Sequence, residues 1–155
     1  MRDIIISIRN DFVAEAIIYS LKKAGDFQPF KLLFSRDDEV VRECEAMQPE
    51  ILLSEVAFGK ATDLRTRLAE ARAVRANTPN CKIVFLCDEN SAPDLAREVM
   101  QAKKDGLIDN FFYSSVGSRY LVAALAAART PPTISSAFST PRTISALRAK
   151  TGRVS

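Results

Sequence analysis

The chain has 155 residues, of which 47% are hydrophobic and 26% are charged, as expected for one soluble globular domain with its own core. It contains no histidine, which excludes Ser-His-Asp and Cys-His nucleophiles, HExxH metal sites and a histidine phosphocarrier. The net charge of +3 is uneven: the segment from Arg129 onward has five basic residues and no acidic one, which leaves −2 on residues 1–128.

Short apolar runs alternate with amphipathic stretches along the first 128 residues. Strands are expected at Asp3–Ile8, Phe30–Ser35, Ile51–Val56, Lys82–Cys87 and Leu107–Tyr113. Helices are expected at Asp11–Lys23, Asp37–Met47, Thr62–Ala76, Ala92–Lys104 and Ser118–Ala128. The expected N-caps are Asp11, Asp37, Thr62 and Ser118, and the expected helix stops are Gly25, Asn77 and Gly106. In the third helix the predicted buried stripe is Leu64, Leu68, Ala71 and Val74, with Arg65, Arg72 and Arg75 forming a solvated face.

Strands that are apolar on both faces, each followed by a helix, indicate a parallel sheet covered on two sides. Five such units predict an α/β protein with a flavodoxin-like, doubly wound, five-stranded sheet of order 2-1-3-4-5. In this fold ligands bind where the strand order reverses, at the carboxyl ends of the first and third strands. Glu55 stands at the end of the third strand, so it lies where a site is expected.

No phosphate-binding loop is present. The chain has only five glycines, and none of them forms GxGxxG or GxxxxGK[ST]. The first strand ends in ISIRNDF, without a glycine that would let backbone amides close on a phosphate. No cofactor and no small-molecule substrate are therefore expected.

The cysteines and the hydropathy indicate the compartment. Cys44, Cys81 and Cys87 have no CxxC spacing, which argues against a zinc site or a disulfide framework and fits reduced thiols. No apolar run approaches the roughly 18–20 residues that span a membrane. The sequence predicts a cytoplasmic protein with no membrane partner and no metal.

The order of elements, with PEILLSEV at Pro49–Val56 and GLIDNFFYSS at Gly106–Ser115, resembles the receiver domain of two-component response regulators. The resemblance covers residues 1–128. It implies two acidic residues after the first strand, a phosphorylated aspartate after the third, Ser/Thr after the fourth and lysine after the fifth. In such domains the carboxylates hold Mg²⁺, while the hydroxyl and the lysine contact the phosphoryl group.

Most of these positions carry other residues in this chain, so the resemblance is to a degenerate receiver, or pseudo-receiver. Arg9 places a positive charge where Mg²⁺ would bind, and an Arg9–Glu55 ion pair is expected instead. Phosphorylation by the usual route is therefore not expected. The corresponding residues are Arg9 and Asn10 at the acidic pair with Asp11 one place later, Glu55 (or Ser54 after a one-residue slip) at the acceptor, Cys87 at the Ser/Thr, Ser114 at the lysine, Ser115 at the following proline, and Phe111 at the aromatic that rotates on activation.

Each of these residues also has a simpler interpretation. Glu55 can be a solvated residue at a strand end, and Arg9 an exposed loop residue. Cys87 and Phe111 can be ordinary core residues.

The segment 129–155 is basic and rich in Ser, Thr and Pro, and we expect a flexible or partner-dependent tail. Within it, STPRTISALRAKTG at Ser139–Gly152 is similar to the opening of a LuxR-type helix-turn-helix output domain. The recognition helix that would read a major groove is not included in this chain.

The sequence therefore predicts an atypical receiver domain, not an enzyme, that acts in signal transduction or transcriptional control through protein–protein contacts, including a homodimer. One alternative is the receiver part of a LuxR-type DNA-binding regulator whose output domain is absent from this chain. Another is a small-ligand sensor or enzyme that uses Asp11, Glu55 and Asp88 at the switch point. The expected interaction surface lies on the fourth helix, the fifth strand and the fifth helix, and comprises Asp94, Arg97, Val99, Lys103, Asp109, Arg119 and Tyr120.

Overall fold

The computed structural model describes residues 1–33, 38–57, 62–88 and 94–128, and the expected tail lies outside the described residues. The chain divides into two units, Met1–Ala123 and Ala124–Ser155. The first unit holds the whole sheet. Of the second unit, the described residues are the end of one helix and Ala128. No helix among the described residues is long and apolar enough to cross a membrane.

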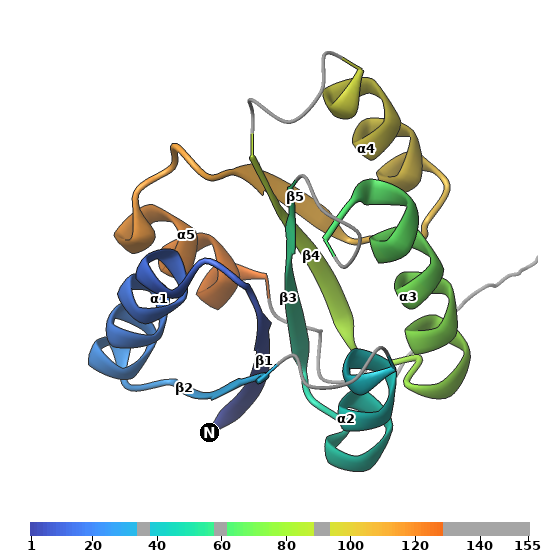
Figure 1. Ribbon diagram of the computed structural model, residues 1–155. Helices are drawn as coiled ribbons and strands as arrows, with labels where there is room; N and C mark the ends of the chain where they lie inside the picture. Colours follow the sequence, from blue (N-terminus) through green and yellow to red (C-terminus); the bar gives the residue numbers. More distant parts are fainter. Residues whose placement is uncertain (34–37, 58–61, 89–93, 129–155) are drawn as a thin grey trace, which may run out of the picture. The chain divides into compact units, whose positions relative to one another are not determined.

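Five strands alternate with five helices along the described chain (Figure 1). The strands form one parallel sheet in the order β2-β1-β3-β4-β5, which confirms the predicted fold class. The strands are β1 (Arg2–Ser7), β2 (Phe27–Lys31), β3 (Ile51–Val56), β4 (Lys82–Cys87) and β5 (Asn110–Tyr113). The helices are α1 (Asp11–Ala24), α2 (Glu39–Met47), α3 (Leu64–Asn77), α4 (Leu95–Lys104) and α5 (Ser118–Ala127).

The sheet has helices on both of its faces. Figure 1 shows α1 and the beginning of α5 on one side, and α2 and α3 on the other. Alternate strand residues, among them Ile5, Leu52 and Ile83, belong to one buried cluster with residues of α2, α3 and α4. The residues between them in the strands are also buried, so both faces of the sheet are covered.

The two edge strands differ from the prediction. β2 begins at Phe27 rather than Phe30 and contains Pro29. A proline is tolerated there because β2 is an edge strand, which among the described strands pairs with β1 alone. β5 begins at Asn110 rather than Leu107, after a turn in which Gly106 adopts a φ of +78°. The predicted end of the second strand at Ser35 lies outside the described residues.

Two helices begin with ordinary N-caps, and each cap lies one residue away from the predicted one. The side chains of Asn10 and Asp63 accept hydrogen bonds from the backbone N–H groups of Val13 and Thr66, so they cap α1 and α3 in place of Asp11 and Thr62. Gly25 ends α1 with a φ of +84°, as predicted. The predicted cap Asp37 and the predicted first turn at Ala92 lie outside the described residues.

Candidate functional site

The carboxyl ends of β1 and β3 lie side by side, because Ser7 pairs with Ser54 in the sheet register. Glu55 follows Ser54 and is half-buried. Its Oε1 accepts a hydrogen bond from the backbone N–H of Arg9 at 2.8 Å. The carboxylate therefore ties the end of β3 to the segment that follows β1. The contact runs through the Arg9 amide, and a pair with the Arg9 guanidinium stays a prediction.

A buried arginine lies next to these strand ends. Arg67 on α3 is only 1% exposed, although a guanidinium is seldom buried without partners. Its Nε donates to the carbonyl oxygen of Glu55 at 2.7 Å. Its Nη2 donates to the carbonyl oxygen of Ser7 at 2.8 Å, and its Nη1 donates to the Ser7 hydroxyl at 2.9 Å. One side chain thus joins the ends of β1 and β3 to α3.

The charge of Arg67 is balanced within the same helix. Its Nη1 lies 2.9 Å from Glu70 Oε1, and the Glu70 side chain is only 14% exposed. Burial raises the pKa of Glu70, and the neighbouring Arg67 opposes that rise by favouring the carboxylate. Glu70 therefore compensates the charge of Arg67, while the guanidinium of Arg67 joins the two strand ends.

Sequence reasoning missed Arg67, although a signal was present. Arg67 lies four residues before Ala71 and seven before Val74, which places it on the buried stripe of α3. The predicted stripe packs on the core, with Ala71 and Val74 buried and Leu64 and Leu68 partly buried, and it also includes Arg67. Arg75 is also not a solvated residue: its Nη2 lies 2.6 Å from the Asp109 carboxylate, and its Nε and Nη1 donate to the backbone oxygens of Leu107 and Cys81.

The residues after β1 do not form a magnesium site. The Asn10 side chain is used to cap α1. The Asp11 carboxylate accepts a hydrogen bond from Lys31 Nζ at 2.6 Å, and the same ammonium lies 3.9 Å from Glu15. Among the described residues, no group of three or more cysteine, aspartate or glutamate side chains could hold a metal ion. These residues therefore do not fit the Mg²⁺ that the resemblance to receiver domains implies.

The remaining candidate residues lie at the ends of β3, β4 and β5. Ser54 is buried, and Ser115 is exposed. Cys87 is buried, and burial raises the pKa of its thiol to about 12, so it is a core residue rather than a reactive one. The backbone N–H of Ser114 donates to the Cys87 carbonyl at 2.9 Å. Phe111 is half-buried and packs edge-to-face against Tyr113, with ring centroids 6.0 Å apart.

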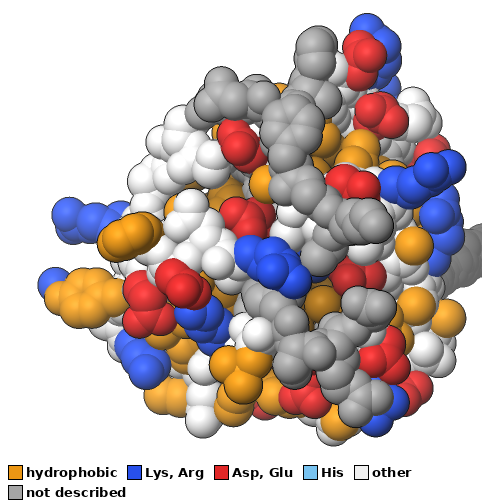
Figure 2. All heavy atoms as spheres, in the orientation of Figure 1, with side chains coloured by type: hydrophobic (Ala, Val, Ile, Leu, Met, Phe, Trp, Pro, Cys, Tyr) orange, Lys and Arg blue, Asp and Glu red, His pale blue; other side chains and the backbone are white. Residues whose placement is uncertain are grey.

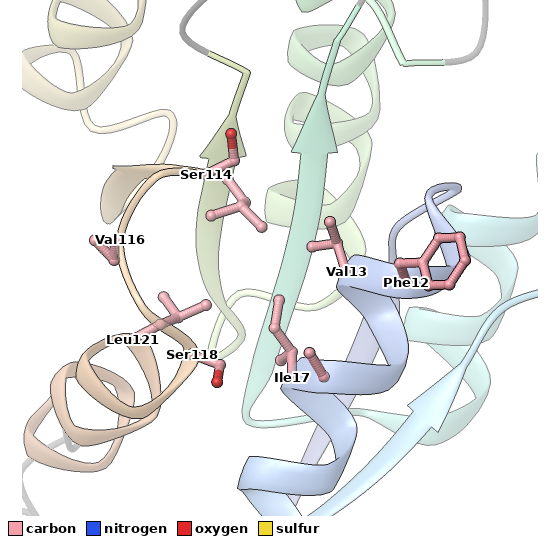
Figure 3. A pocket seen from close by; sticks show the side chains of 9 residues that line it. Phe12, Val13, Ile17, Ser114, Val116, Ser118 and Leu121 are labelled. Atoms are coloured by element: carbon pink, nitrogen blue, oxygen red, sulfur yellow. The ribbon is translucent and has the colours of Figure 1, made fainter.

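An open groove of about 270 Å³ lies between α1 and the beginning of α5 (Figure 3). Its polar lining consists of the hydroxyls of Ser114 and Ser118, and Ser118 also bonds Ser20 on α1 at 3.0 Å. None of the acidic residues of the proposed enzyme or sensor lines this groove, so it gives that alternative no support. The lining residues are Phe12, Val13, Ala16, Ile17, Leu86, Ser114, Val116, Ser118 and Leu121.

The predicted interaction surface needs one correction. Val99 is 0% exposed and belongs to the core, because the inward face of α4 packs on the sheet. Asp109 is bound to Arg75 and to the backbone N–H of Ile83, which gives it a structural contact. The other members lie at least partly at the surface: Asp94 and Arg97 form an exposed ion pair at 3.3 Å, Lys103 donates to Asn110, and Arg119 and Tyr120 are exposed.

Comparison with known proteins gives the fold family. No protein-family model and no curated protein matches the sequence. Among solved structures, the chain is similar to a LuxR-family DNA-binding response regulator from Staphylococcus aureus (TM-score 0.65, 14% identity, 82% of this chain and 98% of that one). It is also similar to a CheY-like protein, tadZ, from Pseudomonas aeruginosa (0.61, 14%, 82% and 98%) and to RcsB from Salmonella enterica serovar Typhimurium bound to a promoter (0.62, 17%, 84% and 70%). The protein therefore has the fold of response-regulator receiver domains.

Proposed function

We propose that this protein is a phosphorylation-independent receiver domain that acts in signalling or transcriptional control by binding other proteins, and that it is not an enzyme. The receiver fold supports the signalling role. The observation that carries the proposal is the buried Arg67, which links the ends of β1 and β3 through hydrogen bonds within the protein.

Two features argue against a phosphorylation switch. A phosphorylated receiver needs an available carboxylate at the end of β3 and a divalent cation that neutralises the incoming phosphoryl group. Here the Glu55 carboxylate already accepts the Arg9 N–H, and the Asn10 side chain caps a helix. The contacts of Arg67 do not depend on any ligand, so the strand ends are held in one arrangement.

The test is exposure of the full chain to Mg²⁺ and acetyl phosphate, followed by mass measurement of the intact protein. We expect no change, while a conventional receiver treated in parallel gains a phosphoryl group of about 80 Da. A stable adduct on Ser54 or Glu55 would overturn the proposal. Addition of Mg²⁺ alone should also leave the thermal unfolding midpoint unchanged, because the residues after β1 do not provide a set of ligands for this ion.

The partner surface that we propose lies on α4, β5 and the first turn of α5. Its exposed members are Asp94, Arg97, Lys103, Arg119 and Tyr120, and the Tyr120 ring packs edge-to-face on Phe112 with centroids 6.4 Å apart. This arrangement offers one aromatic anchor among charges, which suits a protein partner. Replacing Tyr120 with aspartate should abolish partner capture while the protein stays folded, since Tyr120 is exposed and only its contact with Phe112 is lost. Capture equal to that of the native protein would exclude this surface.

The DNA-binding alternative rests on the likeness of Ser139–Gly152 to an output-domain opening and on the structural similarity to two DNA-binding regulators. A gel-shift experiment with this chain distinguishes the two functions. Because the proposed function acts through protein–protein contacts, we expect no sequence-specific shift. A shift that depends on base sequence would favour the alternative.

A further inference from the structure

Helix α1 carries apolar side chains on the face that points away from the core. Its buried face consists of Ala14, Ile17 and Leu21. On the opposite face Phe12 is 90% exposed and Tyr19 is 66% exposed. We use the term outer stripe for the exposed residues Phe12, Ala16, Tyr19 and Lys23, which follow one another at helical spacing. Exposed aromatic rings in a row are unusual on a helix that needs only one apolar face.

The charges on α1 are arranged by sign. Asp11 and Glu15, with side chains 78% and 69% exposed, lie in its first half, where Lys31 of β2 binds Asp11 at 2.6 Å and lies 3.9 Å from Glu15. Lys22 and Lys23 lie in its last turn and are exposed. The ammonium of Lys23 lies 5.8 Å from the centre of the Tyr19 ring. Figure 2 shows acidic, basic and hydrophobic side chains side by side over α1.

The outer stripe is complementary to itself. Its residues are separated by four, three and four positions, so the pattern is the same in both directions. A second α1 laid antiparallel against it places Ala16 opposite Tyr19 and Phe12 opposite Lys23, twice over. The same arrangement brings the acidic half of one helix to the basic end of the other.

We propose that two copies of this chain associate through the outer stripes of their α1 helices, packed antiparallel about a twofold axis. The large ring of Tyr19 then lies on the small side chain of Ala16, and Lys23 lies on the Phe12 ring in a cation–π contact. The apolar groove continues this surface, since Phe12 and Ala16 also line it. The proposal is independent of the partner surface on α4 and β5, and goes beyond it.

The experiment is sedimentation equilibrium of the full chain over a range of concentrations, in low salt. We expect a concentration-dependent dimer. Glu15→Lys should weaken it at least tenfold, because a lysine then faces Lys22 and Lys23. Lys22→Glu should do the same, and the double variant that combines Glu15→Lys with Lys22→Glu should restore association, because it exchanges the two charges and keeps Lys23 for its contact with Phe12.

Two controls separate interface effects from folding and from the other surface. Arg97→Glu changes an exposed charge on α4 and should leave the dimer unchanged. Each variant must keep the native far-UV circular dichroism spectrum and cooperative unfolding. Tyr19→Asp, which keeps the buried face of α1 intact, should give a folded monomer. A native protein that is monomeric at all concentrations, or a Glu15→Lys, Lys22→Glu double variant that fails to associate, overturns the proposal.

Discussion

Replacement of Arg67 by methionine tests the central structural claim. Methionine has an unbranched side chain that fills most of the same space, so the change removes charge and hydrogen bonds with little new cavity. The variant loses the hydrogen bonds to the carbonyl oxygens of Ser7 and Glu55 and to the Ser7 hydroxyl. It also loses the ion pair with Glu70. Glu70 would be left as a nearly buried carboxylate without its cation.

The expected cost follows from the burial of the pair. Removing one partner of a buried ion pair lowers the free energy of unfolding by about 3–5 kcal/mol. This is a large part of the roughly 5–15 kcal/mol that stabilises a typical domain. With a urea dependence of about 2 kcal/mol per M, the unfolding midpoint should fall by about 2 M. The free energy of unfolding of Arg67→Lys should lie between those of the native protein and Arg67→Met. A lysine ammonium keeps the charge, but it cannot reach all the acceptors that the guanidinium reaches.

The assay is urea unfolding followed by circular dichroism, with Arg72→Met as the matched control. Arg72 lies on the same helix and is exposed, so its replacement should change stability by no more than about 0.5 kcal/mol. The double variant Arg67→Met with Glu70→Leu should recover part of the loss, because it removes the uncompensated charge. A loss below about 1 kcal/mol for Arg67→Met, or one equal to that of the control, would refute the assigned role.

Three further measurements test other parts of the structure. Cys44, Cys81 and Cys87 are all buried free thiols, and burial raises the pKa of Cys87 to about 12, so none should react with a disulfide reagent at pH 8 until denaturant is added. Fast labelling of the native protein would contradict this burial. Thr78 is 2% exposed and its hydroxyl has no hydrogen-bond partner among the described residues, so Thr78→Val should raise stability by about 1 kcal/mol in thermal unfolding; a loss would indicate a hidden partner. The hydrogen bond from Thr66 lowers the pKa of Asp63, so Asp63→Ala should destabilise the protein at pH 7, with a difference that shrinks as the pH falls through the lowered pKa; a difference constant with pH would exclude the cap.

The sequence was sufficient to predict the central strands. Ile51–Val56 and Lys82–Cys87 are predicted to the residue, because each has a strand on both sides and is covered on both faces, and so is mostly apolar. The edge strands are less constrained. Pro29 reads as a strand breaker in the sequence, yet the edge strand β2 contains it. The turn at Gly106 makes β5 begin three residues later than predicted.

The candidate site was predicted only in part, for a physical reason. The position of Glu55 at the end of β3 follows from the predicted bounds of that strand. Its contact with Arg9 involves the predicted partner residue, although through the backbone amide. Arg67 was missed because its acceptors include Ser7, sixty residues away, and the backbone carbonyl of Glu55. A local pattern records which residues are apolar, and it does not record which backbone oxygens a buried arginine can reach. An arginine on an apolar stripe is therefore a signal to search for distant acceptors.

On the proposed function, Glu55 and Arg67 together explain how a receiver fold can act without phosphate. Glu55 is held at both of its ends: its carboxylate accepts the Arg9 amide, and its carbonyl accepts the Arg67 guanidinium. A ligand that recruits this carboxylate has to break the first bond, and a displacement of the end of β3 away from α3 has to break the second. Breaking either hydrogen bond is unfavourable, because it leaves a polar group without its partner. A switch needs two arrangements of similar free energy, and these bonds favour one of them. Regulation of such a domain would then come from what binds its surface, so the α1 and α4–β5 variants are the changes expected to alter its activity.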